Sequence, residues 1–287
     1  MRYYQLSRRG QSILAVETDS GAYDLTSVKP DLDSFGALVR TAEITDCTPD
    51  EVAEPHLSGA DPLSTEAVRE TCGLPIDVDE VWAAGVTYQI SEEARRGESS
   101  MPEMYVNVYD AERPELFFKS TRDRTVGPDD AIGVRTDSDW NVPEPELGVV
   151  LFRGEPVGYT VGNDVSSRSI EGENPLYLPQ AKVYDRCCSL GPCIATDIRD
   201  PQTLDMSMQI SRDGETVYDG STNTAEMVRT CEDLVSYYTR HNTVPDLAVL
   251  LTGTSLVPEE GFSLRADDHV TIEIENIGIL SNPVVSV

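Results

Sequence analysis

Two short apolar runs joined by a turn constrain the fold of this chain more than any other stretch. Leu147 to Phe152 forms the first run, and Val157 to Val161 forms the second. Glycine and proline occur in the intervening Arg153 to Pro156, and both residues favour turns. Apolar runs of this length bounded by turn residues are typical of buried strands, so we expect an antiparallel hairpin inside a β-rich core.

Three carboxylates stand where this hairpin opens. Glu144 and Glu146 lie two residues apart at the start of the first strand, so their side chains point to the same face of an extended chain. Asp164 follows the second strand, and pairing of the two strands can bring it back beside them. Carboxylates without a thiolate or an imidazole suit a hard cation, Mg²⁺ or Mn²⁺. The alternative is a solvated acidic edge.

The rest of the chain indicates an α+β protein that is rich in strands. Residues 1–75 predict a small N-terminal α+β domain, and residues 76–287 predict a larger domain of short strands and turns. Within the larger domain, Asp213-Gly214 favours a second hairpin. The predicted helices cover residues 32–41, 64–71, 91–96, 101–111 and 225–241, and the predicted loops include residues 47–61 and 171–179.

The net charge is extreme. The chain has 51 acidic residues against 22 lysines and arginines, which gives a formal net charge of −29. Such self-repulsion disfavours a compact state unless salt screens it, and at multimolar salt the Debye length falls to about 3 Å or less. We therefore expect a protein adapted to a salt-saturated cytoplasm, as in a halophilic archaeon. The acidic residues are scattered among periodic apolar ones, which argues against a disordered acidic protein and against a nucleic-acid mimic.

Several classes of partner are disfavoured by composition. With so few basic residues, binding to nucleic acid through a basic patch is not expected. No apolar run approaches the roughly 18–20 residues that a membrane span needs, and the first residues lack the layout of a signal peptide. The six cysteines and three histidines show no zinc-site or catalytic-triad spacing. We expect a soluble cytoplasmic protein.

Motifs in the second part of the chain resemble the fumarylacetoacetate hydrolase superfamily across residues 78–287. They are Val81 to Tyr88, Phe117-Phe118-Lys119, Pro143 to Leu147, Gly162 to Arg168, Lys182, and Thr252-Gly253-Thr254, in that order. The resemblance implies a mixed β-roll or sandwich that binds a divalent cation, with Glu144, Glu146 and Asp164 as its ligands. It also implies a homodimer or homotetramer.

One departure from the superfamily indicates a particular branch. The hydrolases of the superfamily carry a histidine three residues after the tyrosine of the Gly-x-x-Tyr turn, whereas this chain has Ser91 three residues after Tyr88. The stretch is similar to the archaeal 2-keto-3-deoxy-D-arabinonate dehydratase branch. That branch removes water from a 2-keto-3-deoxy-pentonate, derived from D-xylonate or D-arabinonate, to give 2,5-dioxopentanoate. The alternatives are an acylpyruvate hydrolase or oxaloacetate decarboxylase of the same superfamily, and a non-catalytic metal-binding or salt-adaptation protein.

A dehydratase of this kind needs a base near C3 and an acid near the C4 oxygen. Lys182 is the first candidate for a base or substrate clamp, because a partly desolvated lysine beside a cation has a lowered pKa. The alternative is an ion pair with a neighbouring carboxylate. Glu171 and Glu92 are the candidate acids.

Four further residues are candidates for substrate binding. Lys119 and Arg168 can hold a carboxylate, and their alternative role is a salt bridge with a neighbouring acid. The hydroxyl group of Thr254 can contact substrate, or the residue can be an ordinary turn threonine. Ser91 can contact substrate or can cap the predicted helix 91–96.

Overall fold

The computed structural model describes residues 1–88, 111–259 and 261–287. Its strands are β1 (Arg2–Arg8), β2 (Gln11–Thr18), β3 (Gly21–Asp24), β4 (Asp61–Leu63), β5 (Glu80–Gly85), β6 (Glu115–Thr121), β7 (Thr125–Val126), β8 (Ile132–Val134), β9 (Asn141–Val142), β10 (Pro145–Phe152), β11 (Glu155–Asp164), β12 (Ser166–Ser167), β13 (Cys188–Ala195), β14 (Asp205–Arg212), β15 (Glu215–Asn223), β16 (Leu247–Leu251), β17 (His269–Ile274) and β18 (Gly278–Ser286). Its helices are α1 (Phe35–Thr45), α2 (Pro49–Leu57), α3 (Thr65–Thr71), α6 (Arg168–Glu173), α7 (Leu178–Lys182) and α8 (Cys231–Thr239), with 3₁₀ turns η1 (Leu25–Ser27), η2 (Arg122–Arg124), η3 (Pro175–Tyr177) and η4 (Thr224–Glu226).

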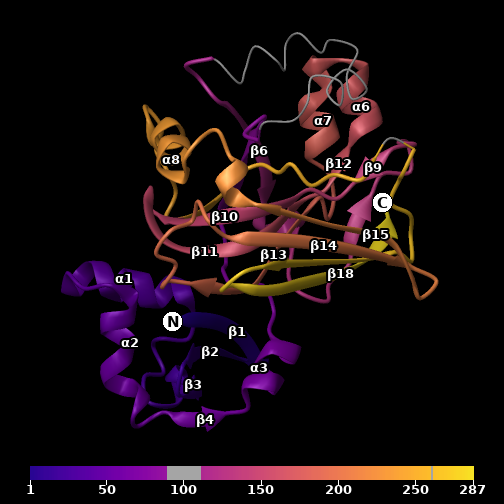
Figure 1. Ribbon diagram of the computed structural model, residues 1–287. Coiled ribbons are helices and arrows are strands. Elements are labelled where there is room, and N and C mark those ends of the chain that lie inside the picture. The colour runs from indigo at the N-terminus through magenta and orange to yellow at the C-terminus, as the bar shows by residue number, and fades with distance from the viewer. Residues whose placement is uncertain (89–110, 260) are drawn as a thin grey trace.

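Two large sheets form the framework (Figure 1). The larger has the strand order β4-β3-β2-β1-β13-β11-β10-β16-β5-β6, with β7 also paired to β13. The second sheet has the order β15-β14-β17-β18-β8, and β12 pairs with β9 in a small separate ladder. One apolar core lies between the two sheets, and another lies between the larger sheet and α1. The prediction of a β-rich α+β fold is confirmed.

The predicted hairpin lies at the centre of the larger sheet as β10 and β11. Leu147 pairs with Val161, and the ladder continues to Phe152 and Glu155 at the turn. Arg153 and Gly154 both have positive φ, at 51° and 91°, which is the geometry of a tight two-residue hairpin turn. Every residue of β10 is buried, because β11 and β16 flank it and both faces of the sheet are covered. This burial explains why the sequence shows an apolar run there and not an alternation.

The N-terminal strands extend the sheet that contains the hairpin. Arg2 pairs with Ala195 and Tyr3 pairs with Ile194, which joins β1 to β13. Figure 1 shows α1, α2 and β3 at one end of the molecule, with α6 and α7 at the other. Strand pairing therefore crosses the predicted division at residue 75. That two domains meet there stays a proposal, which limited proteolysis between residues 72 and 79 would test.

Three local predictions were wrong. Residues 47–61, predicted as loop, contain α2, because Thr48 and Glu51 form a capping box and Pro49 occupies the first helical position. Residues 171–179, also predicted as loop, include the second half of α6, the η3 turn and the start of α7. The helix predicted over 225–241 is shorter and begins at Cys231, because Met227 is extended and Thr230 caps α8. The helices predicted over 91–96 and 101–111 fall, apart from residue 111, outside the described residues.

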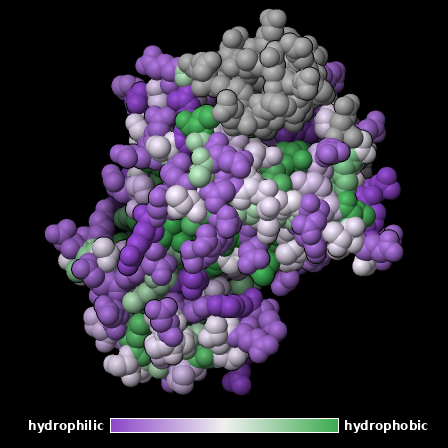
Figure 2. Space-filling model, viewed as in Figure 1, coloured by the Kyte–Doolittle hydropathy of each residue, from purple (hydrophilic) through white to green (hydrophobic). Residues whose placement is uncertain are grey.

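Figure 2 shows hydrophilic residues over much of the described part of the face drawn there. In the described part of the chain, none of the helices combines the length and the apolar character that crossing a bilayer requires.

The acidic surface leads to a prediction about salt. We expect that lowering KCl from multimolar to about 0.1 M destabilises the fold by about 3 kcal/mol or more, because the longer Debye length exposes the repulsion of a net charge of −29. For a domain somewhat smaller than this chain, that loss corresponds to a fall in the thermal midpoint of roughly 6–12 °C. Thermal melts followed by circular dichroism at several KCl concentrations measure it. A midpoint that does not depend on salt would contradict the interpretation.

Candidate metal and substrate site

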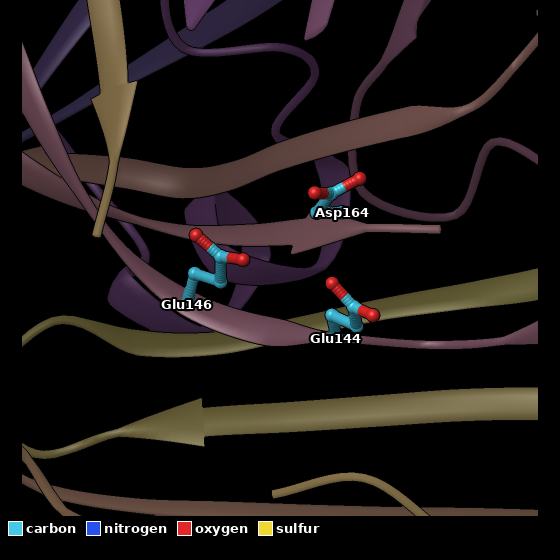
Figure 3. Close-up of side chains that lie close together, drawn as sticks. All are labelled: Glu144, Glu146 and Asp164. Atoms are coloured by element: carbon cyan, nitrogen blue, oxygen red, sulfur yellow. The ribbon is translucent and has the colours of Figure 1, made fainter. Parts of the chain in front are cut away.

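The three carboxylates of the hairpin converge, as the sequence predicts. Glu144, Glu146 and Asp164 each offer an oxygen atom, and these atoms all lie within 4.8 Å of one another. Figure 3 shows Glu144 and Glu146 rising from the same side of one strand, with Asp164 beside them on the neighbouring strand. Their exposed fractions are 5%, 1% and 0%. The alternative of a solvated acidic edge is therefore wrong.

Backbone hydrogen bonds hold this arrangement in place. The N–H group of Asp164 donates to the carbonyl of Glu144 at 2.9 Å, and the N–H group of Glu144 donates to the Asn163 side chain at 3.1 Å. Two residues after the end of β16, the N–H group of Gly253 donates to Glu146 Oε2 at 2.6 Å. Gly253 has a φ of +85°, and a Cβ atom there would lie 2.1 Å from Thr87 Oγ1. Only glycine therefore fits at the position that donates to Glu146.

The three carboxylates differ in their electrostatic environment. Burial raises the pKa of Glu146 well above its usual value, and the charges of Asp164 and Glu144 raise it further. Among the described residues, no basic side chain forms an ion pair with Glu146. Burial also acts to raise the pKa of Glu144, but the charges of Lys182 and Arg168 outweigh it, so that this pKa is lowered. The cluster thus holds an uncompensated carboxylate.

Lys182 reaches the carboxylates from the end of α7. Its Nζ lies 2.7 Å from Glu144 Oε2, 3.0 Å from Asp164 Oδ2 and 2.7 Å from Ser166 Oγ. Burial lowers the pKa of Lys182, but Asp164 and Glu144 outweigh it and raise this pKa well above its usual value. The lowered pKa that the sequence suggested is therefore wrong for this arrangement. Here Lys182 is an ammonium ion in the ion pairs that were the alternative.

Arg168 and Glu171 lie next to this cluster on α6. Arg168 Nη2 is 2.8 Å from Glu144 Oε1, and Arg168 Nη1 is 3.8 Å from Glu171 Oε2. The predicted salt bridge of Arg168 is present, and both residues line the same pocket as the carboxylates. Glu171 Oε2 is buried and, among the described residues, accepts no hydrogen bond, although it lies in the ion pair with Arg168. Arg168 and Glu171 thus stay candidates for contact with substrate.

Lys119 lies behind the pocket and does not line it. Its side chain is fully buried and forms an ion pair with Asp164. Its Nζ also donates to the carbonyl groups of Val165 at 2.9 Å and Lys182 at 2.6 Å. These three acceptors match the three donors of an ammonium group. This buried position does not support the predicted contact with substrate, and the salt bridge that was the alternative is present.

The pocket above the carboxylates contains residues that the motifs did not single out. It is lined by Ala84, Gly85, Val86, Glu115, Phe117, Glu144, Glu146, Arg168, Glu171, Leu178, Lys182, Gly253 and Thr254. Thr254 is thus placed where the sequence predicts it. Glu115 was missed, although Glu115 and Phe117 share one face of β6 at a spacing of two residues. Lys182 Nζ lies 5.2 Å from the centre of the Phe117 ring.

Two predicted site residues cannot be placed. Ser91 and Glu92 lie outside the described residues, so their predicted contact with substrate and acid role stay predictions.

The residues present fit a divalent cation. Mg²⁺ and Mn²⁺ prefer oxygen ligands, and three convergent carboxylates offer them, two of which line the pocket. Glu146 in particular is a buried carboxyl group without an ion pair in the described part of the chain, and its pKa is raised; a cation would favour its ionised form. Glu144, Glu146 and Asp164 are the residues that would hold it.

Comparison with known proteins agrees with this geometry. Residues 80–285 match the family described as fumarylacetoacetate (FAA) hydrolase C-terminal. The chain is 63% identical over 289 residues to a probable 2-keto-3-deoxyxylonate dehydratase of Haloferax volcanii, with 100% of both chains covered. It is 41% identical over 293 residues to the 2-dehydro-3-deoxy-D-arabinonate dehydratase of Saccharolobus solfataricus, covering 99% of this chain and 96% of that protein.

A solved structure is similar over the full length. It is a 2-keto-3-deoxy-D-arabinonate dehydratase complexed with magnesium and 2,5-dioxopentanoate. The TM-score is 0.84 and the sequence identity 37%, and the match covers 100% of this chain and 99% of that one.

Proposed function

The chain belongs to the fumarylacetoacetate hydrolase family, and from this premise we propose that it is a metal-dependent dehydratase of 2-keto-3-deoxy-pentonates. The product is 2,5-dioxopentanoate, and Mg²⁺ is the proposed cofactor, with Mn²⁺ as a substitute. The parent sugar acid is D-xylonate or D-arabinonate. Both give the same keto acid, since removal of the C3 hydroxyl and oxidation of C2 leave only the C4 stereocentre.

One observation carries the proposal. In the buried triad of Glu144, Glu146 and Asp164, the two glutamates line a pocket that is also lined by Lys182 and Glu171. The pocket lining contains neither a histidine nor a cysteine in the described part of the chain. The site therefore offers oxygen ligands for a hard cation and groups that move protons. It lacks the imidazole that a hydrolytic member of the superfamily uses on water.

A cation held by the triad would supply Lewis-acid polarisation of the C2 keto oxygen, which makes the C3 proton more acidic. The chain's own residues must then bind the substrate, accept the C3 proton and deliver a proton to the C4 hydroxyl as it leaves. Arg168 and the hydroxyl group of Thr254 line the pocket and are the proposed contacts for substrate oxygens. The remaining steps are proton transfers, which need no hydride cofactor and no nucleophile.

The protonation states favour a division of roles between Lys182 and a pocket carboxylate. Lys182 is an ammonium ion here, so its Nζ can donate a proton to the leaving C4 hydroxyl. Glu171 Oε2 accepts no hydrogen bond from the described residues and can accept the C3 proton. Glu115 is a second carboxylate of the pocket and an alternative acceptor. The sequence suggested Lys182 as the base and Glu171 as an acid. The proposed roles are the reverse, because an ammonium ion can donate a proton but cannot accept one.

The cellular location and the oligomeric state complete the proposal. We propose a cytoplasmic location, supported by the acidic composition that suits a salt-saturated cytoplasm, and cell fractionation tests it. We also propose a homodimer or homotetramer, which rests on the family resemblance, and light scattering after gel filtration at high KCl tests it.

The decisive experiment is a coupled assay. With 2-keto-3-deoxy-D-xylonate, Mg²⁺ and multimolar KCl, we expect 2,5-dioxopentanoate, detected by NADP⁺ reduction through an added dehydrogenase. Chelation with EDTA should lower the rate at least about 100-fold, because the cation supplies several kcal/mol of transition-state stabilisation, and added Mg²⁺ should restore it. Oxaloacetate in place of the keto acid is the control. Pyruvate formation from oxaloacetate, with no product from the keto acid, would refute the dehydratase in favour of a decarboxylase.

A further inference from the structure

Lys119 connects three elements of the site with one buried charge. It lies on β6, its ion pair reaches Asp164 on β11, and one of its hydrogen bonds reaches the carbonyl of Lys182 at the end of α7. The exposed fraction of its side chain is 0%, and the ring of Tyr184 lies 5.7 Å from its Nζ. The ammonium group thus has fixed partners and no route to a substrate.

Asp164 is held by ammonium groups at both of its oxygen atoms. Lys119 pairs with Oδ1, and Lys182 Nζ lies 3.0 Å from Oδ2. Ser166 Oγ lies 3.4 Å from Oδ1 on the same side as Lys119. Rotation of the carboxylate about its χ2 angle would break at least one of these contacts. The orientation of this proposed metal ligand is therefore set by its neighbours and not by a cation.

Rigidity of a carboxylate ligand affects Mg²⁺ and Ca²⁺ differently. Mg²⁺ requires near-octahedral geometry with oxygen atoms at about 2.0–2.1 Å, whereas Ca²⁺ accepts six to eight oxygen atoms at about 2.3–2.6 Å and often uses both oxygens of a carboxylate. A carboxylate whose two oxygens are each held by a lysine cannot swing into a two-oxygen contact. The held orientation thus favours the smaller ion.

We propose that Lys119 is a positioning residue that makes the site selective for Mg²⁺ over Ca²⁺ by fixing the orientation of Asp164. Through the Lys182 carbonyl, the same ammonium group also fixes the backbone from which the catalytic lysine projects. The inference rests on the proposed function only in that the triad must bind a divalent cation.

The test compares Lys119→Met with Lys29→Met. Lys29 is exposed and lies in the N-terminal part, so the two variants lose the same charge. Dissociation constants for Mg²⁺ and Ca²⁺ are measured by isothermal titration calorimetry of metal-free protein at constant multimolar KCl. The two ions carry the same charge, so the loss of a positive charge shifts both constants alike and leaves their ratio unchanged. In Lys119→Met we expect the Ca²⁺ dissociation constant divided by the Mg²⁺ dissociation constant to fall about tenfold or more. This is the size of effect typical of residues that orient metal ligands. In Lys29→Met this ratio should match the wild-type ratio.

Steady-state kinetics give a second readout. Because Lys119 does not line the pocket, Lys119→Met should lower kcat while the KM for the keto acid stays within about twofold. The second variant is Lys119→Gln, in case methionine prevents folding. Glutamine keeps two N–H donors for the carbonyls of Val165 and Lys182. Circular dichroism checks the fold of both variants. Lys119→Gln should lose selectivity in the same way.

Four outcomes would overturn the inference. An unchanged ratio of the two dissociation constants in a folded Lys119 variant would do so. An increased KM in that variant would indicate that Lys119 binds substrate. A wild-type protein that binds both ions equally well would also do so. A wild-type protein that binds neither ion overturns the metal site itself and with it this inference.

Discussion

Replacing Glu146 with glutamine is expected to abolish tight Mg²⁺ binding and to lower kcat by about 10³-fold or more. A cation that polarises the keto oxygen supplies several kcal/mol of transition-state stabilisation, and about 4 kcal/mol corresponds to that factor. Glutamine has the same shape and can still accept the hydrogen bond from the Gly253 N–H group. It removes a buried carboxylate whose pKa is raised by burial and by its two acidic neighbours. The metal-free variant should therefore be at least as stable as the wild type.

Thermal melts with and without Mg²⁺ separate loss of the site from loss of the fold. Wild-type protein should melt at a higher temperature in Mg²⁺, because a ligand that binds only the folded state stabilises it. The Glu146→Gln variant should melt at the same temperature with and without Mg²⁺. Glu155→Gln is the matched control, since Glu155 is exposed at the start of β11 and should behave as the wild type does. Normal turnover or normal metal affinity in Glu146→Gln would refute the ligand assignment.

Replacing Lys182 with methionine should have the second largest effect, a fall in kcat of about 10²–10⁴-fold, the range of a lost general acid or base. Its effect on metal binding should be opposite to that of Glu146→Gln. Lys182 neutralises Glu144 and Asp164 in the metal-free protein, so its loss leaves buried carboxylates less well paired. Breaking such a pair costs about 3–5 kcal/mol. We expect the lower end, because Arg168 and Lys119 remain beside the two acids.

Denaturant unfolding and calorimetry check this pattern. The metal-free Lys182→Met variant should have a lower free energy of unfolding than the wild type, and the stabilisation by Mg²⁺ should be larger. Lys29→Met again controls for the charge change. A variant that keeps its turnover would rule out a catalytic role for Lys182. Weaker Mg²⁺ binding in the variant would contradict the view that Lys182 competes with the cation for the same carboxylates.

The triad could be predicted because its spacing is local. Glu144 and Glu146 share a face by the two-residue period of a strand, and a hairpin with a two-residue turn returns the chain to Asp164. The errors were also local in origin. The segment around Thr48 has the composition of a loop. However, a threonine followed three residues later by a glutamate is a signature of a helix start.

The roles of the two lysines could not be predicted in the same way. Lys119 lies 45 residues before Asp164 in sequence, and Lys182 lies 18 after it, yet both reach its carboxylate. The raised pKa of Lys182 follows from these ion pairs. The sequence suggested a lowered pKa from partial burial beside a cation, with an ion pair as the alternative, and it could not decide between the two.

By itself, the sequence determined the central hairpin, the three convergent carboxylates and the acidic character of the surface. All of these depend on residue type and on spacing of a few residues. Only the tertiary structure decided that β1 joins β13, that Gly253 donates to Glu146, and that Lys119 supports the site from behind. Those contacts join segments far apart in the chain. Their energies depend on burial and on distances of a few ångströms, which residue spacing does not encode.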